Sequence, residues 1–131
     1  MRKCLDEGID TVVMEVSSEA FALWRTEGLY FDMLIGTTIA SDHLDSHKTI
    51  ENYREVKKKI LSMSKPGGVV LLNSDDEWLK SWSSDLPGYV MTYGSHQADF
   101  MISDVELTLE GSSFTFLNHR VRTSLLSKGN V

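Results

Sequence analysis

Phe31-Asp32-Met33-Leu34-Ile35-Gly36-Thr37-Thr38 is a nearly continuous apolar run, and runs of this kind decide the fold class of the chain. They are typical of strands buried on both faces of a parallel sheet. Similar runs cover Ile9 to Val16, Val69 to Asn73 and Tyr89 to Tyr93. Ser17 to Arg25 is expected to be a loop with a short helix. Because helical segments separate the strands, we predict an α/β fold with a mostly parallel sheet flanked by helices.

The clearest helix is predicted from Thr49 to Ser64, where Thr49 can accept a hydrogen bond from the first turn. Its apolar residues recur at spacings of three and four, as in a helix with one buried face. These residues are Ile50, Tyr53, Val56, Ile60 and Leu61. Of three successive lysines, Lys57 lies within this stripe, whereas Lys58 and Lys59 point away from it. We therefore expect only Lys57 to face the body of the protein.

The second half of the chain changes character. Pro66-Gly67-Gly68 is predicted to end the long helix. Ser74-Asp75-Asp76-Glu77 then opens a short helix with acidic residues in its first turn. From residue 98 onward apolar and polar residues partly alternate, which predicts an antiparallel hairpin or meander. The prediction is a partial domain with a parallel α/β part at 1–94 and a small antiparallel β part at 95–131.

The composition narrows the class of protein. The chain has 131 residues and a net charge of −6, which disfavours nucleic-acid binding because that function needs a basic face. No segment approaches the ~20 apolar residues that a membrane span requires. Cys4 is the one cysteine, so an internal disulfide is impossible and a reducing cytoplasm is expected. No secretory signal core is present.

Polar residues follow two of the predicted strands. Glu15 ends the first, and Asp42-His43-Leu44-Asp45 follows the second after a short loop. Ligands of open α/β sheets bind at the carboxyl ends of the strands. A carboxylate oxygen suits Mg²⁺, and an imidazole can complete a second metal site. Burial favours the neutral amine of Lys57, and a neutral amine can react with carbon dioxide to give an anionic carbamate.

Simpler interpretations compete with this site. A glutamate at a strand end is often merely exposed, and a lysine at the edge of an apolar stripe usually extends to water. His43 and His47 are four residues apart, but two histidines without a third ligand indicate a metal weakly. A separate metal hydrolase built on Asp42, His43, His47 and Glu15, or a non-catalytic domain that keeps the fold, are therefore alternatives.

Several motifs in order resemble the Mur ligases, most closely the MurE-type UDP-N-acetylmuramoyl-dipeptide ligases of peptidoglycan synthesis. They are Met14-Glu15-Val16-Ser17-Ser18, Arg25, Phe31-Asp32, Thr37, Asp42-His43-Leu44-Asp45, Tyr53, Lys57 and Asn73-Ser74-Asp75-Asp76. The resemblance spans about Asp10 to Val131. It implies the P-loop-NTPase-like central domain of that family. Other ligases of the superfamily, folylpolyglutamate synthase-like or cell-wall amidating, are less similar because Glu-Val-Ser-Ser is typical of the MurE branch.

The resemblance implies roles for particular residues. Glu15 would ligate the Mg²⁺ between the β- and γ-phosphates of ATP, His43 would ligate a second Mg²⁺, and Lys57 would be carbamylated and support that metal. Ser17 and Arg25 match positions that contact the UDP-muramoyl substrate. The role of the Asn73–Asp76 motif is less well defined.

The resemblance also implies the reaction and its partners. The family couples ATP cleavage to amide formation: a carboxylate of the UDP-N-acetylmuramoyl-peptide becomes an acyl phosphate, and the amino group of an amino acid displaces the phosphate. Asn130 would lie near the nucleotide. Glu19 stands where the family usually has a histidine, and Thr38 stands where it usually has an asparagine. These two departures leave the identity of the acceptor substrate open.

No Gly-x-x-x-x-Gly-Lys-[Ser/Thr] loop occurs in the chain. The resemblance places that loop before residue 1 and a C-terminal, amino-acid-binding domain after residue 131. The isolated chain is therefore expected to be inactive as a ligase, because it lacks the cradle for the ATP phosphates.

Overall fold

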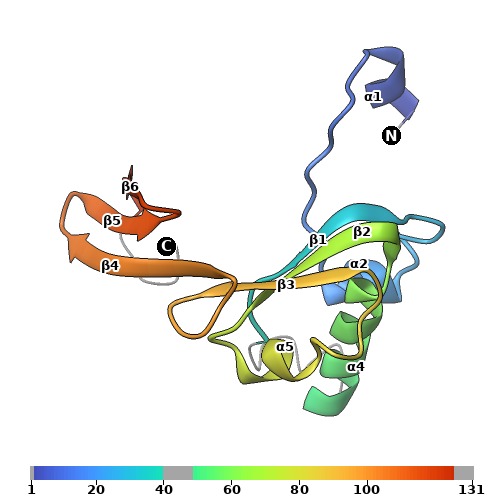
Figure 1. Cartoon of the computed structure of the whole chain (residues 1–131). Helices are drawn as coiled ribbons and strands as arrows, with labels where there is room; N and C mark the ends of the chain where they lie inside the picture. The colour runs from blue at the N-terminus through green and yellow to red at the C-terminus, as the bar shows by residue number, and fades with distance from the viewer. Residues whose placement is uncertain (1, 40–48, 126–131) are drawn as a thin grey trace.

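The strands follow one another across a sheet in chain order in the computed structural model, which describes residues 2–39 and 49–125 (Figure 1). The strands are β1 (Phe31–Gly36), β2 (Ser64–Asn73), β3 (Tyr89–Gly94), β4 (Phe100–Thr108), β5 (Gly111–Phe116) and β6 (His119–Thr123). β1, β2 and β3 are parallel, and β4, β5 and β6 are antiparallel. The predicted α/β class, with a small antiparallel unit at the C-terminal end, is confirmed. β3 and β4 also join the two parts through a short parallel pairing.

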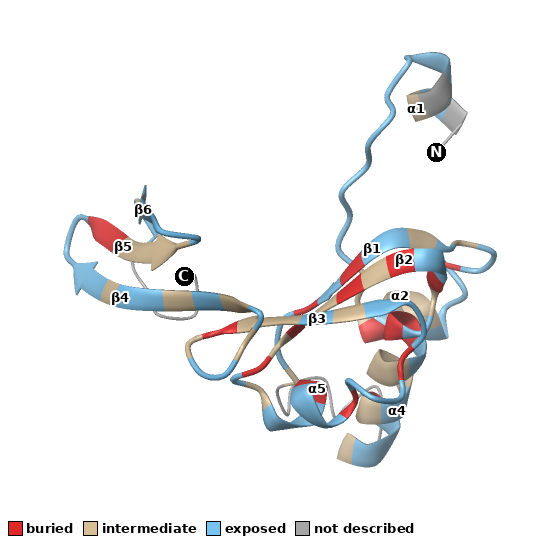
Figure 2. Cartoon of the chain, viewed as in Figure 1, coloured by how far each residue is buried: buried red, intermediate tan, exposed pale blue. Residues whose placement is uncertain are grey.

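The core lies between β1–β3 and the helices on one face of the sheet. Helix α4 (Ile50–Leu61) and helix α5 (Glu77–Ser81) both lie below the strands in Figure 1. The buried cluster consists of Leu34, Leu61, Val70, Leu72, Leu79, Trp82 and Leu86. Figure 2 shows buried residues in red along β1 and β2 and in α5. Each such side chain stabilises the fold by about 1.5–3 kcal/mol on burial, so this face holds the sheet together.

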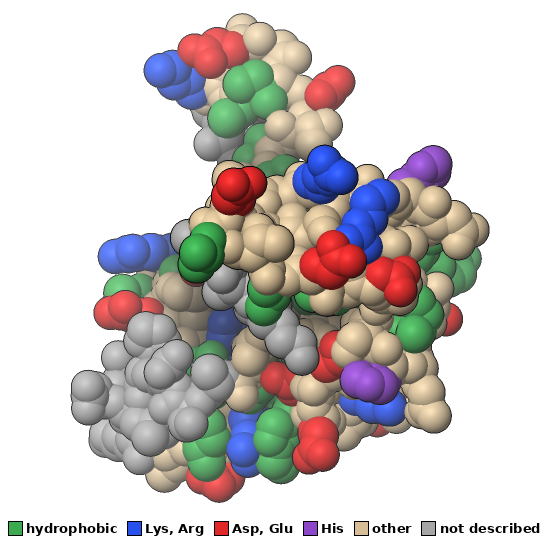
Figure 3. Space-filling view, turned by 90° about the vertical axis from the view of Figure 1, so that its left-hand side faces the viewer, with side chains coloured by type: hydrophobic (Ala, Val, Ile, Leu, Met, Phe, Trp, Pro, Cys, Tyr) green, Lys and Arg blue, Asp and Glu red, His purple; other side chains and the backbone are tan. Residues whose placement is uncertain are grey.

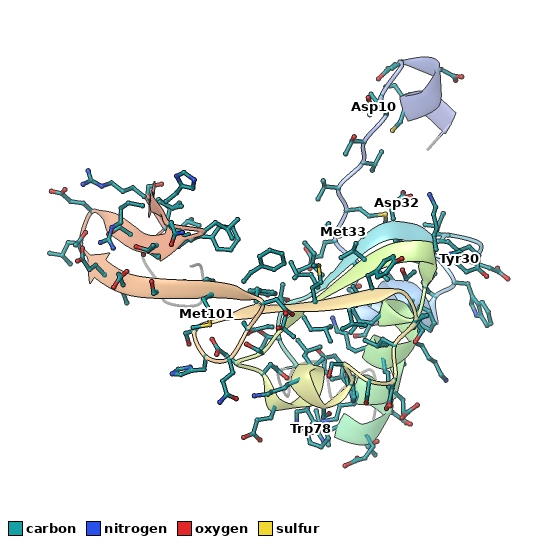
Figure 4. All side chains as sticks on the ribbon, viewed as in Figure 1. Asp10, Tyr30, Asp32, Met33, Trp78 and Met101 are labelled. Carbon is teal, nitrogen blue, oxygen red and sulfur yellow. The ribbon has the colours of Figure 1, made fainter. Side chains whose placement is uncertain are left out.

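The opposite face of β1–β3 carries exposed apolar side chains. Met33 and Ile35 on β1 are 56% and 55% exposed, and Tyr89 and Met91 on β3 are 67% and 38% exposed. Figure 4 shows Met33 on the side of the sheet away from Trp78 of α5. The apolar strands predict helices on both faces of the sheet. Within residues 2–39 and 49–125, the helices cover only one of these faces. The described contacts therefore cover the apolar side chains on one face of these strands and leave those on the other face exposed.

The predicted strand from Ile9 to Val16 is wrong. Helix α1 (Arg2–Asp6) is followed by Gly8, whose φ of +72° is the left-handed conformation expected of a glycine cap. The residues that follow have no strand pairing, and Val13 is 95% exposed. β-branched residues favour extended backbone, but a strand forms only where a neighbouring edge supplies hydrogen bonds. The described partner of β1 is β2, and Figure 1 shows residues 9–16 leading away from the sheet.

The start and phase of α4 agree with the sequence, but its end does not. Thr49 Oγ1 accepts a hydrogen bond from Asn52 N at 3.2 Å, as a helix cap should. The helix ends at Leu61, and β2 already begins at Ser64. Pro66-Gly67-Gly68 thus lies inside β2 instead of ending the helix. Gly67 has a φ of +78°, and the pairing with β1 is irregular beside it, so this proline and these glycines form a bulged stretch of strand.

The β4–β6 unit is half exposed, as its alternating sequence predicts. Arg120 and Glu106 form an ion pair at 2.5 Å between β6 and β4. On the face shown in Figure 3, acidic, basic and hydrophobic side chains are interspersed.

No helix in the described part of the chain is long and apolar enough to cross a membrane.

Candidate active site at the carboxyl ends of the strands

The carboxyl ends of β1, β2 and β3 meet at one edge of the sheet. Leu72 pairs with Gly36 on one side, and Asn73 pairs with Tyr93 on the other. Parallel strands bring the loops that follow them to this edge, where open α/β sheets bind their ligands. The segments after β1, β2 and β3 are therefore the places to look for function.

Lys57 is half-buried on the side of α4 that packs against the protein. Its Nζ lies 5.6 Å from the centre of the Tyr53 ring, within the range of a cation–π contact. Burial lowers the pKa of Lys57, and the nearby Glu15 carboxylate partly opposes this by raising it. The amine of Lys57 is therefore easier to deprotonate than an ordinary lysine amine.

The neighbouring lysines differ in part from the prediction. Lys59 is exposed, as predicted, but Lys58 is half-buried, because its Nζ makes an ion pair with Asp85 Oδ2 at 2.8 Å. The expectation that only Lys57 faces the body is therefore wrong for Lys58. The two side chains nevertheless have different surroundings, an aromatic ring for Lys57 and a carboxylate for Lys58.

Glu15 is exposed on the segment before helix α2 (Ser18–Ala22). Its carboxylate raises the pKa of Lys57, against the larger effect of burial, which lowers it. His43 lies outside the described residues, as do the other members of Asp42-His43-Leu44-Asp45. Among residues 2–39 and 49–125, no three His, Cys, Asp or Glu side chains are grouped as metal ligands. Of the predicted trio, Glu15 and Lys57 lie among the described residues, and Glu15 affects the pKa of Lys57.

The predicted substrate-binding residues lie at either side of α2. Ser17 caps that helix, with its Oγ accepting a hydrogen bond from Ala20 N at 3.0 Å. Arg25 follows the helix and is exposed. Asn130, the predicted nucleotide-binding residue, lies outside the described residues. Ser17 therefore has a local structural task, whereas the Arg25 side chain can reach an anionic group from solvent.

Asn73 and Asp76 connect the end of β2 to the segment after β1. Asn73 Nδ2 donates to Thr37 O at 2.9 Å, and Asp76 Oδ2 accepts from Ile39 N at 2.7 Å. Asp76 also caps α5, as the acidic start of that helix predicts. The sequence shows the cap but not the link to Ile39, because the two residues are 37 positions apart.

Ser74 and Asp75, which lie between Asn73 and Asp76 in the sequence, hold the segment after β3. Ser74 Oγ donates to His96 O at 3.0 Å, and Asp75 Oδ2 accepts from both the amide and the hydroxyl of Ser95 at 2.8 Å. Burial alone would raise the pKa of Asp75, but hydrogen bonds from Ser95 and His96 outweigh it and lower that pKa. This carboxylate is therefore held in its charged form.

Gly94, at the end of β3, allows this arrangement. Its φ is +154°, and a Cβ built there would lie 2.5 Å from Ser74 Oγ. A side chain at this position would collide with the hydroxyl that anchors the loop. Glycine is thus required where β3 passes close to the Asn73–Asp76 motif.

An open α/β sheet with charged and polar side chains at the carboxyl ends of its strands defines an α/β domain of the ligand-binding class. Comparison with known proteins narrows the class. The chain belongs to the Mur ligase middle domain family, whose model matches residues 1–131.

Two curated relatives are 34% identical to the chain. One is a UDP-N-acetylmuramoyl-L-alanyl-D-glutamate–2,6-diaminopimelate ligase from Bacillus velezensis, and the match covers 99% of this chain and 29% of the relative. The other is the corresponding L-lysine ligase from Staphylococcus haemolyticus, with 100% and 28% coverage. The chain thus spans less than a third of the length of these relatives.

Solved structures share the fold. A UDP-N-acetylmuramoyl-L-alanyl-D-glutamate–2,6-diaminopimelate ligase matches with a TM-score of 0.72 and 26% identity, over 88% of this chain and 26% of that one. A MurF ligase from Thermotoga maritima in complex with ADP matches with a TM-score of 0.60 and 18% identity, over 82% and 25%. The second likeness concerns the fold alone.

Proposed function

We propose that this chain is part of the central domain of an ATP-dependent ligase that adds an amino acid to a UDP-N-acetylmuramoyl-peptide in peptidoglycan synthesis, in the cytoplasm. The names of the two curated relatives support the substrate and the reaction. The observation that carries the proposal is Lys57, which is half-buried with its Nζ 5.6 Å from the centre of the Tyr53 ring, and whose pKa burial lowers.

The donor set of the site fits Mg²⁺ and ATP. Glu15 offers carboxylate oxygens, the ligand type that Mg²⁺ prefers, and it is exposed to incoming phosphates. His43 would hold a second ion, as the family resemblance implies. When bound, Mg²⁺ neutralises charge on the phosphoryl group during transfer. The ADP complex of the related MurF fold supports an adenine nucleotide as the partner.

Lys57 would contribute as a carbamate. Its neutral Nζ attacks the carbon of carbon dioxide, an N–C bond forms, one C–O bonding pair moves to oxygen, and the amine loses a proton to solvent. The product is an anion with oxygen donors, which can support a cation where an ammonium group would repel it. Burial favours the neutral amine that this reaction needs.

Arg25 and Ser17 would face the UDP-muramoyl substrate. The guanidinium group of Arg25 is suited to phosphate or carboxylate, because its fork can donate two parallel hydrogen bonds. Ser17 would act less directly, since its hydroxyl oxygen already accepts the Ala20 amide. We therefore assign Arg25 the larger share of substrate affinity.

The experiment uses the full-length ligase that contains this chain. ADP release is measured with and without UDP-N-acetylmuramoyl-L-alanyl-D-glutamate and an amino acid. Lys57→Arg should reduce the rate by about tenfold to a hundredfold or more, whereas Lys59→Arg, on the exposed side of the same helix, should leave it unchanged. Equal rates for the two variants, or ADP release without dependence on both substrates, would refute the proposal.

A further inference from the structure

The turn that ends α2 has a tryptophan at a position where glycine is usual. Leu23 is the C-cap of the helix, and Trp24 follows it with a φ of 59°. Trp24 N donates to Phe21 O and Arg25 N donates to Ala20 O, both at 3.0 Å. These are the two hydrogen bonds of a Schellman motif, in which the left-handed residue after the cap is usually glycine. Trp24 therefore holds a backbone conformation that its Cβ disfavours.

Packing of the indole ring does not offset this strain. Trp24 is 74% exposed, and among residues 2–39 and 49–125 its ring makes no stacking or cation–π contact. The other two tryptophans serve the fold, because Trp82 is buried in the core and the Trp78 ring packs on Arg54. A strained backbone that the surrounding contacts do not explain points to a role of the side chain in function.

The backbone around Trp24 is anchored on both sides. Ser18, at the start of α2, and Thr26, two residues after Trp24, are both buried. Trp24 O accepts from Glu27 N at 3.2 Å, and Thr26 O accepts from Leu29 N at 3.1 Å. The exposed indole is thus held out from an ordered turn. A side chain held in this way loses less conformational freedom when it binds a ligand.

Arg25 indicates what kind of ligand the ring would meet. It is the next residue, with its Cα about 3.8 Å from that of Trp24. Arg25 is exposed, and it forms no ion pair in the described part of the chain. A free guanidinium group beside a free aromatic face suits a ligand in which an anionic group lies close to a ring.

We propose that Trp24 is a substrate-binding residue whose indole contacts a ring of the UDP-muramoyl substrate, while Arg25 binds a neighbouring phosphate or carboxylate. This inference rests on the proposed function, which assigns Arg25 to that substrate. The ring is either the uracil base, which offers a π face for stacking, or the muramoyl sugar, which offers C–H groups. The competing interpretation is that Trp24 only supports the fold.

Trp24→Gly separates the two interpretations by its effect on stability. Glycine adopts the left-handed conformation without strain, so the folded-to-unfolded ratio of the 131-residue chain should rise by about twofold to fivefold in urea unfolding. Leu117→Gly is the matched control, because Leu117 is 56% exposed and has a φ of 48° in the turn between β5 and β6. It should raise the ratio similarly. A loss of stability in Trp24→Gly would show that the indole supports the fold and would overturn the proposal.

The second measurement is substrate binding to the full-length ligase by calorimetric titration without ATP. For UDP-N-acetylmuramoyl-L-alanyl-D-glutamate, Trp24→Gly should raise the Kd by about threefold to tenfold. Trp24→Tyr keeps an aromatic face and should stay within about twofold of the unsubstituted enzyme, and Leu117→Gly should leave the Kd unchanged. An unchanged Kd in Trp24→Gly, or a Kd in Trp24→Tyr as high as in Trp24→Gly, would overturn a contact made by the ring.

A parallel titration with UDP alone identifies the ring that Trp24 contacts. If Trp24→Gly weakens the binding of UDP as well as that of the complete substrate, the indole contacts the uracil base. If it weakens only the binding of the complete substrate, the indole contacts the muramoyl sugar. Either result supports the proposal.

ADP release by the same preparations distinguishes a failure of this inference from a failure of the proposed function. If the unsubstituted enzyme is an active ligase and Trp24→Gly binds the substrate equally well, the role of Trp24 is overturned and the proposed function stands. If the unsubstituted enzyme binds the substrate more tightly than Trp24→Gly but releases no ADP, the proposed function falls and Trp24 remains a binding residue. If the unsubstituted enzyme does not bind the substrate, both are overturned.

Discussion

Lys57 Nζ lies 5.6 Å from the centre of the Tyr53 ring, one helical turn earlier on the same face of α4. This pairing brings the amine against an aromatic surface instead of water, and burial is the main cause of its lowered pKa. Glu15 acts in the opposite direction, since a nearby negative charge favours the ammonium form. The charge state of Lys57 thus depends on the segment before α2 as well as on α4.

The first prediction follows from that dependence. In a ¹³C-lysine NMR titration of the chain, Lys57 should titrate below the ordinary value of 10.5. Glu15→Gln should lower its pKa further, because the variant removes the charge that favours the ammonium group. Glu19→Gln, which removes an exposed carboxylate four residues later, should leave the Lys57 titration in place. A Lys57 pKa that is insensitive to Glu15→Gln would show that the two groups do not interact.

The second prediction concerns Asp75 and acid stability. Its pKa is lowered in the folded protein, so its contribution to stability is fully present above the unfolded pKa and is lost as the pH falls through the folded pKa. Asp75→Asn should therefore destabilise the chain at about pH 7 and lose less stability than the parent between about pH 5 and pH 3. Urea unfolding at several pH values measures this. Parallel stability curves for parent and variant would contradict it.

The third prediction tests the contact between α4 and α5. The guanidinium carbon of Arg54 lies 3.5 Å from the centre of the Trp78 ring, and Arg54 Nε is buried without a hydrogen-bond partner in the described part of the chain. The ring face therefore offers the main compensation for burying this nitrogen. A double-mutant cycle with Arg54→Met and Trp78→Leu should give a coupling of about 0.5–2 kcal/mol. A coupling near zero would mean that the stacking adds nothing to stability.

The sequence predicts the elements whose partners are close in the chain or whose pattern is strong. Thr49 as a cap, the stripe along α4 and the acidic start of α5 are local features, and each is found as predicted. Residues 9–16 show the limit of β-propensity as a predictor, because a strand also needs the edge of a neighbouring strand to pair with. Pro66-Gly67-Gly68 shows another limit, since such residues can end a helix or form a bulge, and only the pairing with β1 distinguishes the two.

In the candidate site too, local features can be predicted from the sequence, whereas contacts between residues remote in sequence cannot. Helix phase places Lys57 on the packed face, but the ion pair of Lys58 with Asp85 needs a residue 27 positions away. The link between Asp76 and Ile39 is equally remote in sequence. The motif Asn73-Ser74-Asp75-Asp76 stands out in the sequence, yet its double contact, with the segment after β1 and the segment after β3, depends on the order of strands in the sheet.

The last prediction compares the two faces of the sheet. Leu72 is fully buried on the face that α5 covers, and it lies against the end of β1 beside Gly36. Ile35 is 55% exposed on the other face. Leu72→Ala should lower the free energy of unfolding by about 2–5 kcal/mol, because it removes contacts and leaves a cavity. Ile35→Ala removes a side chain of similar size and should cost less than about 1 kcal/mol in the chain alone. Urea unfolding of both variants gives the two values. If the costs are equal, the face that carries Ile35 is covered in solution, and the described contacts understate what holds β1 in place.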